Sequence, residues 1–248
     1  MTTDSDSSAG PAFETGVSAH LVRPGALVEI ETIAGADAHH LGRVRRSRVG
    51  EHVTVADGYG NWRRYEIRSI TADRIEAIAT GESFRSSAPP RRVTVASALS
   101  KGTKIETITQ QLAELGVARF VPFVGRRSVV RLDAAARHKL HERLVATARS
   151  AAMQSRRAWL CEVTPVSTVD ELADRLDREL LVATIDGERD PDSLVGSGDL
   201  SVITGPEGGF DTTERELFAT WGARSWCLAD GVLRAETAPL AAATLLLS

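Results

Sequence analysis

The chain has 248 residues, of which 42% are hydrophobic and 25% charged, a composition that excludes global disorder and leaves room for two domains. No apolar run reaches the roughly 20 residues that span a bilayer, and Cys161 and Cys227 lack zinc-site spacing, so both are expected to be buried thiols of a cytoplasmic protein. The formal net charge of -3 conceals a division, because residues 20–157 hold 24 Lys and Arg against 13 Asp and Glu, whereas residues 158–248 hold 6 against 17.

The first nineteen residues are rich in Ser, Thr, Asp and Gly and contain no Lys or Arg. A secretory signal needs a basic start followed by an apolar stretch, and this segment has neither. We therefore expect residues 1–19 to form a flexible N-terminal extension.

Short strands separated by turn signals are predicted from about residue 27 to residue 79. The stretch ADGYGN (56–61) places Asp-Gly and Gly-Asn between two alternating runs, which is typical of a β-hairpin. Several short strands within about 60 residues favour a small β-barrel, and we assign this domain to residues 20–85.

Arginine clusters accompany these strands and recur beyond them. RVRRSR (43–48) holds four arginines, and GRRSVVR (125–131) holds three. A guanidinium group pairs bidentately with phosphate and stacks on bases, which favours an RNA-binding face. Salt bridges to the acidic C-terminal part explain the same clusters, and the charge pattern leaves both interpretations open.

The stretch SFRSSAPPRR (83–92) breaks the strand pattern and is expected to be a stiff linker. Beyond it the pattern alternates between strands and helices. Strands are predicted at 92–99, 119–124, 179–185, 200–204 and 225–229, and helices at 104–117, 132–157, 167–177, 212–222 and 236–247. Near-continuous apolar strands are typical of a parallel sheet covered on both faces, so residues 92–248 are predicted to form an open α/β domain.

The loop in SVITGPEGGF (201–210) lies between a predicted strand and a helix, where small-molecule sites occur. It lacks the Lys-Ser/Thr pair of a P-loop and the glycine spacing of a dinucleotide site, and Glu207 would repel a polyanion. These features favour a ligand with few negative charges, hydroxyl groups and a cationic centre. A tight turn without any ligand stays open as an alternative.

A second loop, in CLADGVLRAETAPLAA (227–242), also joins a strand end to a helix, so the two loops should meet at one sheet edge. Together the two stretches resemble the cofactor loops of SPOUT methyltransferases. With AHHLGRVRRSRVGE (38–51), ALSKGTKIETITQQLAELGV (98–117) and SAAMQSRR (150–157), nearly the whole chain resembles the RsmE branch of that superfamily, the 16S ribosomal RNA uridine-N3 methyltransferases.

The resemblance implies an α/β fold, in which a small PUA-like β-barrel precedes a SPOUT-type domain with a deep trefoil knot. It also implies S-adenosylmethionine as cofactor, a homodimer, and 16S rRNA or the small ribosomal subunit as partner, with no membrane and no metal. The cofactor-binding residues implied are Thr184, Ile185, Thr204, Gly205, Pro206, Glu207, Gly208, Leu228, Leu233, Thr237 and Ala238.

For catalysis, we expect Arg234 to orient the substrate or the loop, and Glu236 to be its partner or a proton acceptor; an ordinary salt bridge at a helix start stays open. The expected RNA-binding residues are Arg43, Arg45, Arg46, Arg48, Lys104, Arg127 and Arg156. The alternative is that these side chains only form a solvated surface. His39 and His40 have no matching third ligand, so no metal site is predicted.

Two departures from the family pattern keep other functions open. Met153 stands where the family usually has a glutamate, and Ala229-Asp230-Gly231 replaces its usual Gly-x-Arg. One alternative is a catalytically silent PUA-like RNA-binding protein. Another is a SPOUT enzyme for a different RNA position, because the cofactor loops do not specify the nucleoside.

Overall fold

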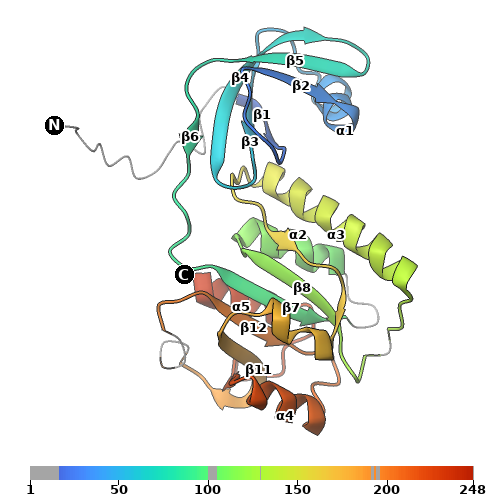
Figure 1. Cartoon of the computed structure of the whole chain (residues 1–248), viewed down its shortest axis with the longest axis vertical. Helices are drawn as coiled ribbons and strands as arrows, with labels where there is room; N and C mark the ends of the chain where they lie inside the picture. The colour runs from blue at the N-terminus through green and yellow to red at the C-terminus, as the bar shows by residue number, and fades with distance from the viewer. Residues whose placement is uncertain (1–16, 100–104, 129, 191–192, 194–195, 248) are drawn as a thin grey trace, which may run out of the picture. The chain divides into compact units, whose positions relative to one another are not determined.

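The computed structural model describes residues 17–99, 105–128, 130–190, 193 and 196–247 (Figure 1). The chain divides into two compact units. One consists of Met1–Ala88 with Ala152–Leu160, and the other of Pro89–Ala151 with Cys161–Ser248. The N-terminal unit therefore includes a short segment that lies far along the chain.

The N-terminal unit is built on a mixed sheet. Its strands are β1 (Val17–Val22), β2 (Ile30–Ala34), β3 (His52–Ala56), β4 (Asn61–Ile70), β5 (Arg74–Ala79) and β6 (Phe84–Arg85), and a short helix α1 (Gly35–His39) runs into a π-helical turn (His40–Val44). The order is β1-β3-β4-β5-β2, with β6 paired to β4. The hairpin predicted at ADGYGN is confirmed, because β3 and β4 pair antiparallel across it.

Alternation along these strands produces the core of this unit. In β3, Val53 and Val55 are buried, and in β4 Tyr65 and Ile67 are buried. Their side chains fall on one face because successive strand residues point to opposite sides. β1, which pairs parallel with β3, has no counterpart among the predicted strands.

The C-terminal unit contains the predicted parallel sheet, in which every strand pair is parallel. Its strands are β7 (Val93–Ala98), β8 (Arg119–Val124), β9 (Glu162–Val163), β10 (Ser167–Thr168), β11 (Glu179–Glu188), β12 (Leu200–Thr204) and β13 (Arg224–Trp226). They run in the order β10-β8-β7-β12-β11-β13, with β9 beside β8. All residues of β7 and β12 are buried, as expected for central strands with both faces covered.

Helices cover both faces of this sheet. The helices are α2 (Ile105–Leu115), α3 (Ala134–Gln154), α4 (Thr212–Thr220) and α5 (Ala238–Leu247). Val93 and Val95 of β7 pack into a cluster with α2, α3 and α5, whereas Ala96 and Ala98 face Phe218 of α4. α2 presents Ile105, Ile108 and Leu112 on one side, which is the apolar stripe that its sequence predicts.

Three elements differ from the prediction. The segment 167–177 forms a strand and two 3₁₀ turns (Val169–Glu171 and Ala173–Arg175), because Leu176 is already extended where the chain enters β11. α3 ends at Gln154, since Arg156 has a φ of 56° and turns the chain. The last strand, β13, is shorter than the 225–229 segment and begins one residue earlier.

β11 makes an excursion that has no equivalent in its neighbours. Ala183 and Glu188 both pair with Trp226 of β13, so the intervening residues 184–187 leave the ladder. Gly187 lies where a Cβ atom would be 2.5 Å from the backbone of Ser225 and Trp226. Glycine is required at this position, because any side chain would collide with the main chain of β13.

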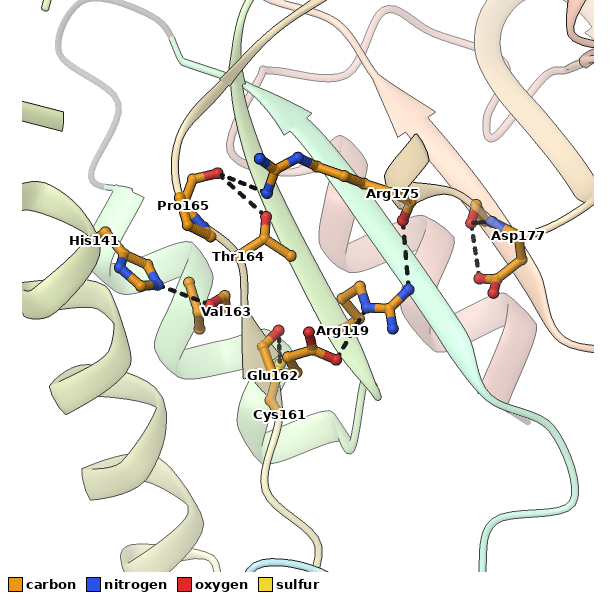
Figure 2. Close-up of polar contacts among 10 residues, drawn as sticks. Arg119, His141, Cys161, Glu162, Val163, Thr164, Pro165, Arg175 and Asp177 are labelled. Atoms are coloured by element: carbon orange, nitrogen blue, oxygen red, sulfur yellow. Dashed lines mark hydrogen bonds and ion pairs between the residues drawn. The ribbon is translucent and has the colours of Figure 1, made fainter. Parts of the chain in front are cut away.

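Polar contacts link neighbouring segments at the amino-terminal ends of the parallel strands (Figure 2). Arg119 at the start of β8 pairs with Glu162 at 3.0 Å, and its guanidinium also donates to the carbonyl of Arg175 at 3.4 Å. Asp177 and Ser201 are joined by bonds of 2.8 and 2.9 Å that link the approach to β11 with β12. This edge is cross-linked by its own side chains.

Candidate functional site

A cavity of about 350 Å³ opens at the carboxyl end of β12. Three segments supply most of its lining: residues 183–185 of β11, the loop 205–210, and residues from the stretch 228–238. Cavities that bind small molecules span about 300–1,000 Å³ and occur at this edge of α/β sheets. The two loops predicted to meet at one sheet edge do meet there.

The glycine-rich loop is held in place by its own packing. A Cβ atom on Gly205 would lie 3.2 Å from the ring of Phe210, and Phe210 packs edge-on against Phe218 of α4, with ring centroids 4.9 Å apart. Pro206 is buried, whereas Glu207 is exposed. The loop therefore presents Glu207 from a fixed frame.

α4 begins with the predicted capping box. The Asp211 carboxylate accepts from the backbone N–H of Glu214 at 2.7 Å, and the Glu214 carboxylate accepts from that of Asp211 at 2.9 Å. The second oxygen of Glu214 accepts from the backbone N–H of Arg126 at 2.8 Å, and the residue is 1% exposed. Glu214 thus joins the start of α4 to the turn that follows β8.

That turn brings Arg127 to the cavity. Its guanidinium donates to the carbonyl of Gly208 at 3.1 Å, and the residue lines the cavity. Ser128, which follows it, is buried and donates its hydroxyl to the carbonyl of Leu99. A cation predicted to touch RNA therefore lies against the glycine-rich loop.

Thr184 carries an unsatisfied polar atom at the cavity. Its hydroxyl is buried and has no hydrogen-bond partner within the described part of the chain, and the residue belongs to the cavity lining. Buried hydroxyls are normally paired, since an unpaired one costs about 1–3 kcal/mol. Thr184 lies in the excursion of β11, outside the ladder with β13.

The second loop is tied to the segment after β11. Arg189 and Asp230 form an ion pair, and Arg215 of α4 pairs with Asp186 at 3.5 Å. The change from Gly-x-Arg to Ala229-Asp230-Gly231 therefore provides a partner for Arg189. Ala229, Gly231 and Arg215 also line the cavity.

The structure brings together most of the predicted cofactor residues. Those that line the cavity are Thr184, Ile185, Gly205, Pro206, Glu207, Gly208, Leu228, Leu233 and Ala238. Thr204 is fully buried and donates to the carbonyl of Ala96 at 3.2 Å. Thr237 donates its backbone N–H to Arg234 at 2.9 Å, and neither threonine belongs to the lining.

Arg234 and Glu236 lie beside the cavity in sequence but are not part of its lining. Their charged groups are 3.9 Å apart, and their side chains are 84% and 47% exposed. Solvent weakens such a pair, so it contributes little to stability.

The predicted RNA-binding arginines fall in both units. Arg43, Arg45, Arg46 and Arg48 are exposed and lie in or just after the π-helical turn. Arg156 is exposed in the segment that belongs to the N-terminal unit, and Arg127 lies at the cavity. Lys104 lies outside the described residues.

Several lining residues were not predicted. Among them are Ala183, Gly209, Phe210, Arg215, Val232 and Ala235. Arg215 lies in the first turn of α4, at the end that faces the glycine-rich loop, so its position relative to the capping box was the available signal. Met153, the other departure from the family pattern, packs against the apolar core of the N-terminal unit. This position therefore supplies an apolar contact and no carboxylate.

The described residues include neither a candidate metal site nor a candidate membrane span. The described residues contain no group of three or more His, Cys, Asp or Glu side chains that could hold a metal ion. Nor do they include a helix whose length and apolar character would allow it to cross a membrane.

Known proteins match both units. An RNA methyltransferase domain family matches residues 87–247, and an RNA methyltransferase PUA domain family matches residues 33–80. Ribosomal RNA small subunit methyltransferase E of Mycobacterium bovis is 31% identical over 84% of this chain and 82% of its own. The Bacillus subtilis protein of that name is 30% identical over 84% and 86%.

Solved structures agree with the sequence comparison. The ribosomal RNA small subunit methyltransferase E of Neisseria gonorrhoeae, solved with S-adenosylmethionine bound, superposes with a TM-score of 0.83 at 29% identity, covering 92% of this chain and 96% of its own. The chain therefore belongs to the RNA methyltransferase family and, within it, to the ribosomal RNA small subunit methyltransferase E family.

Proposed function

We propose that this chain transfers a methyl group from S-adenosylmethionine to N3 of a uridine in the 16S ribosomal RNA of the small subunit. The observation that carries the proposal is the cavity between residues 183–185, the glycine-rich loop and the stretch 228–238. Family membership supports the enzyme class and the rRNA substrate, whereas the cavity supports the kind of cofactor.

The cavity fits the chemistry of this cofactor. S-adenosylmethionine has a positive sulfonium centre and two ribose hydroxyls, and it has no phosphate. The unpaired hydroxyl of Thr184 offers a hydrogen bond to a polar ligand, and Glu207 in the lining favours a cationic group over a polyanion. The residues present therefore suit a sulfonium nucleoside better than a triphosphate.

The residues that would hold the cofactor share one sheet edge and include polar, apolar and backbone groups. They are Thr184, Ile185, Gly205, Pro206, Glu207, Gly208, Leu228, Leu233 and Ala238, with Thr204 and Thr237 as buried or adjacent supports. When bound there, S-adenosylmethionine supplies an electrophilic methyl group.

The chain's own residues then have two tasks. They orient the uracil ring so that N3 faces the methyl group, and such positioning lowers a barrier by roughly 7–11 kcal/mol at best. They also stabilise negative charge on the uracil oxygens as the N3 proton leaves. We assign the second task to the Arg234 guanidinium, with the Glu236 carboxylate as its partner or as proton acceptor.

Further features belong to the same proposal. Of the extension expected at residues 1–19, residues 1–16 lie outside the described residues, and residues 17–19 belong to β1. We infer a PUA-like RNA-binding barrel at 20–85 and a SPOUT domain at 92–248 whose C-terminal segment threads a deep trefoil knot. We also infer a cytoplasmic homodimer. Sedimentation at micromolar concentration is expected to show a dimer, and a monomer would contradict it.

The function is tested in two steps. Calorimetric titration is expected to show binding of S-adenosylmethionine but not of ATP. Mass spectrometry of 16S rRNA nucleosides from a strain lacking the gene is then expected to show loss of 3-methyluridine. An unchanged 3-methyluridine level with normal cofactor binding would indicate another RNA position. Absence of cofactor binding, even with 16S rRNA present, would indicate a silent RNA-binding protein.

A further inference from the structure

The turn between β3 and β4 holds a tyrosine rigidly in solvent. Tyr59 is 66% exposed, and its hydroxyl has no hydrogen-bond partner among the residues that the structure describes. The buried Asp57 carboxylate accepts from the backbone N–H groups of Tyr59 at 2.7 Å and Asn61 at 3.0 Å. Gly58 and Gly60, with φ of 83° and 95°, provide the turn that only glycine adopts readily.

A tryptophan from the returning segment supports this turn from one side. A Cβ atom on Gly60 would lie 2.4 Å from the ring of Trp159, so the indole rests on the glycine backbone. The indole N–H donates to the carbonyl of Ser87 at 3.1 Å. Backbone bonds from Gly60 to Ala158 (3.0 Å) and from Leu160 to Gly58 (2.9 Å) fix the two segments together.

An arginine lies over the tryptophan. The Arg85 guanidinium is 5.2 Å from the centroid of the Trp159 ring, and it donates to the Asn61 side chain at 2.9 Å. The Asn61 amide in turn donates to the Asp57 carboxylate. Arg85 is exposed in β6, the short strand paired to β4 (Figure 1). Tyr59 forms an isolated backbone bridge with Trp159, and we call Tyr59, Arg85 and Trp159 together the stacking surface.

We propose that the stacking surface binds unpaired nucleobases of the RNA substrate. Aromatic rings and guanidinium planes are the groups on which splayed-out bases stack in RNA-binding proteins. The bonds that Asp57 accepts from Tyr59 and Asn61, and that Asn61 accepts from Arg85, hold these groups in place before binding, which lowers the entropy lost when a base docks. The proposal rests on the proposed function, since it specifies how the N-terminal unit engages the same RNA.

Charge favours RNA over a protein partner. Tyr59 and Arg85 lie within residues 20–157, which hold 24 basic and 13 acidic residues, and Arg156, three residues before Trp159, is exposed. A polyanion with stackable rings satisfies both the cationic and the aromatic character of this surface. A protein partner satisfies the aromatic part alone unless it is acidic.

The test measures binding of the full-length protein to fluorescent oligouridine and to an RNA duplex. Tyr59→Ala is expected to weaken oligouridine binding at least about fivefold, Tyr59→Phe to retain it, and Arg85→Lys to weaken it although the charge is kept. Ile30→Ala is the matched control, because Ile30 is 59% exposed in the same unit but lies outside the stacking surface; it should bind as the parent does.

Salt dependence separates stacking from phosphate contact. Tyr59→Ala should lower affinity at every salt concentration without changing the slope of log K against log[salt], because stacking releases no counterions. Unchanged affinity of Tyr59→Ala, absence of oligouridine binding by the parent, or equal weakening for duplex would overturn the proposal. The proposal would also be overturned if Tyr59→Ala lost binding to a ribosomal protein while it still bound oligouridine normally.

A control keeps this failure distinct from failure of the proposed function. Each variant is also titrated with S-adenosylmethionine and assayed for methylation of 16S rRNA. If the parent protein binds the cofactor and methylates rRNA while Tyr59→Ala binds oligouridine normally, only the stacking surface is rejected. If the parent does neither, the function itself is rejected.

Discussion

The Thr184 hydroxyl and the Cys161 thiol are both buried polar groups of the C-terminal unit, but their surroundings give them opposite roles. The Thr184 hydroxyl lies at the cavity without a partner in the described chain. The Cys161 thiol is enclosed by the core and donates weakly to the carbonyl of Glu162 at 3.9 Å (Figure 2). The first arrangement leaves capacity for a ligand, whereas the second excludes reactivity.

Thr184→Val is expected to weaken S-adenosylmethionine binding about fivefold or more, because it removes a hydroxyl that the ligand would pair with. Without ligand, the same change should leave the free energy of unfolding unchanged or raise it, since it removes an unsatisfied polar group. Calorimetry and urea denaturation measure the two effects. Thr184→Ser, which keeps the hydroxyl, is the control, and equal affinity of the Val and Ser variants would contradict the assignment.

Burial raises the pKa of the Cys161 thiol to about 12, and the neighbouring Glu162 carboxylate adds to the rise. An unfolded cysteine loses its proton near pH 8.5, whereas the folded one keeps it. The unfolded state then binds fewer protons, so the free energy of unfolding falls as pH rises from about 9 to 12, by about 1 kcal/mol per pH unit. Urea denaturation at several pH values over this range measures the effect. The free energy of unfolding of Cys161→Ala should fall less steeply with pH than that of the parent protein, and an equally steep fall would contradict the prediction.

At the scale of elements, one carboxylate links α4 to the turn after β8. Glu214 accepts from the backbone N–H groups of Asp211 and Arg126, and Arg127 follows directly and donates to Gly208. The helix start, the turn and the glycine-rich loop therefore share one hydrogen-bonded frame. Rigid supporting contacts of this kind hold site residues at their working positions.

Glu214→Ala is expected to lower the free energy of unfolding by about 2–4 kcal/mol, because it leaves two N–H groups unpaired near the core. Glu214→Gln, which keeps one carbonyl acceptor, should cost less. Glu216→Ala is the control, since Glu216 lies exposed on the same helix. Urea denaturation measures all three, and an equal cost for the Glu214→Ala and Glu216→Ala variants would contradict the role of the carboxylate.

The elements also show where sequence reasoning works. Local signals specified the hairpin at residues 56–61, the amphipathic α2, the capping box of α4 and the buried parallel strands. The 3₁₀ turns after β10 and the excursion of β11 were not predictable, because pairing with distant strands overrode local preference. Likewise, the two cavity loops followed from the pattern of strand ends, but Arg127 reaches the cavity through tertiary contacts that no local spacing records.

At the scale of the whole molecule, charge is divided along the chain. The basic part, residues 20–157, includes the exposed arginines of the N-terminal unit, whereas the cavity is lined mainly by the acidic part, residues 158–248. RNA binding and cofactor binding should therefore respond differently to salt, since only the former releases many counterions.

The logarithm of the association constant for 16S rRNA is expected to fall linearly with log[salt], with a slope of about -0.7 to -0.9 per phosphate contacted. Replacing Arg43 by Ala should reduce that slope by about one contact. The affinity for S-adenosylmethionine should change little over the same range. Filter binding and calorimetry measure the two, and a flat rRNA titration would contradict an electrostatic RNA face.

The N-terminal unit takes its last nine residues, Ala152–Leu160, from beyond α3, and this has a consequence for synthesis on the ribosome. Its first 88 residues emerge early, but Gly58 and Gly60 stay uncovered until Trp159 and Leu160 have been added. At roughly 5–20 residues per second this takes about 4 to 14 s. The two units therefore fold in an interleaved order, and the N-terminal unit closes only while the methyltransferase unit is already being made.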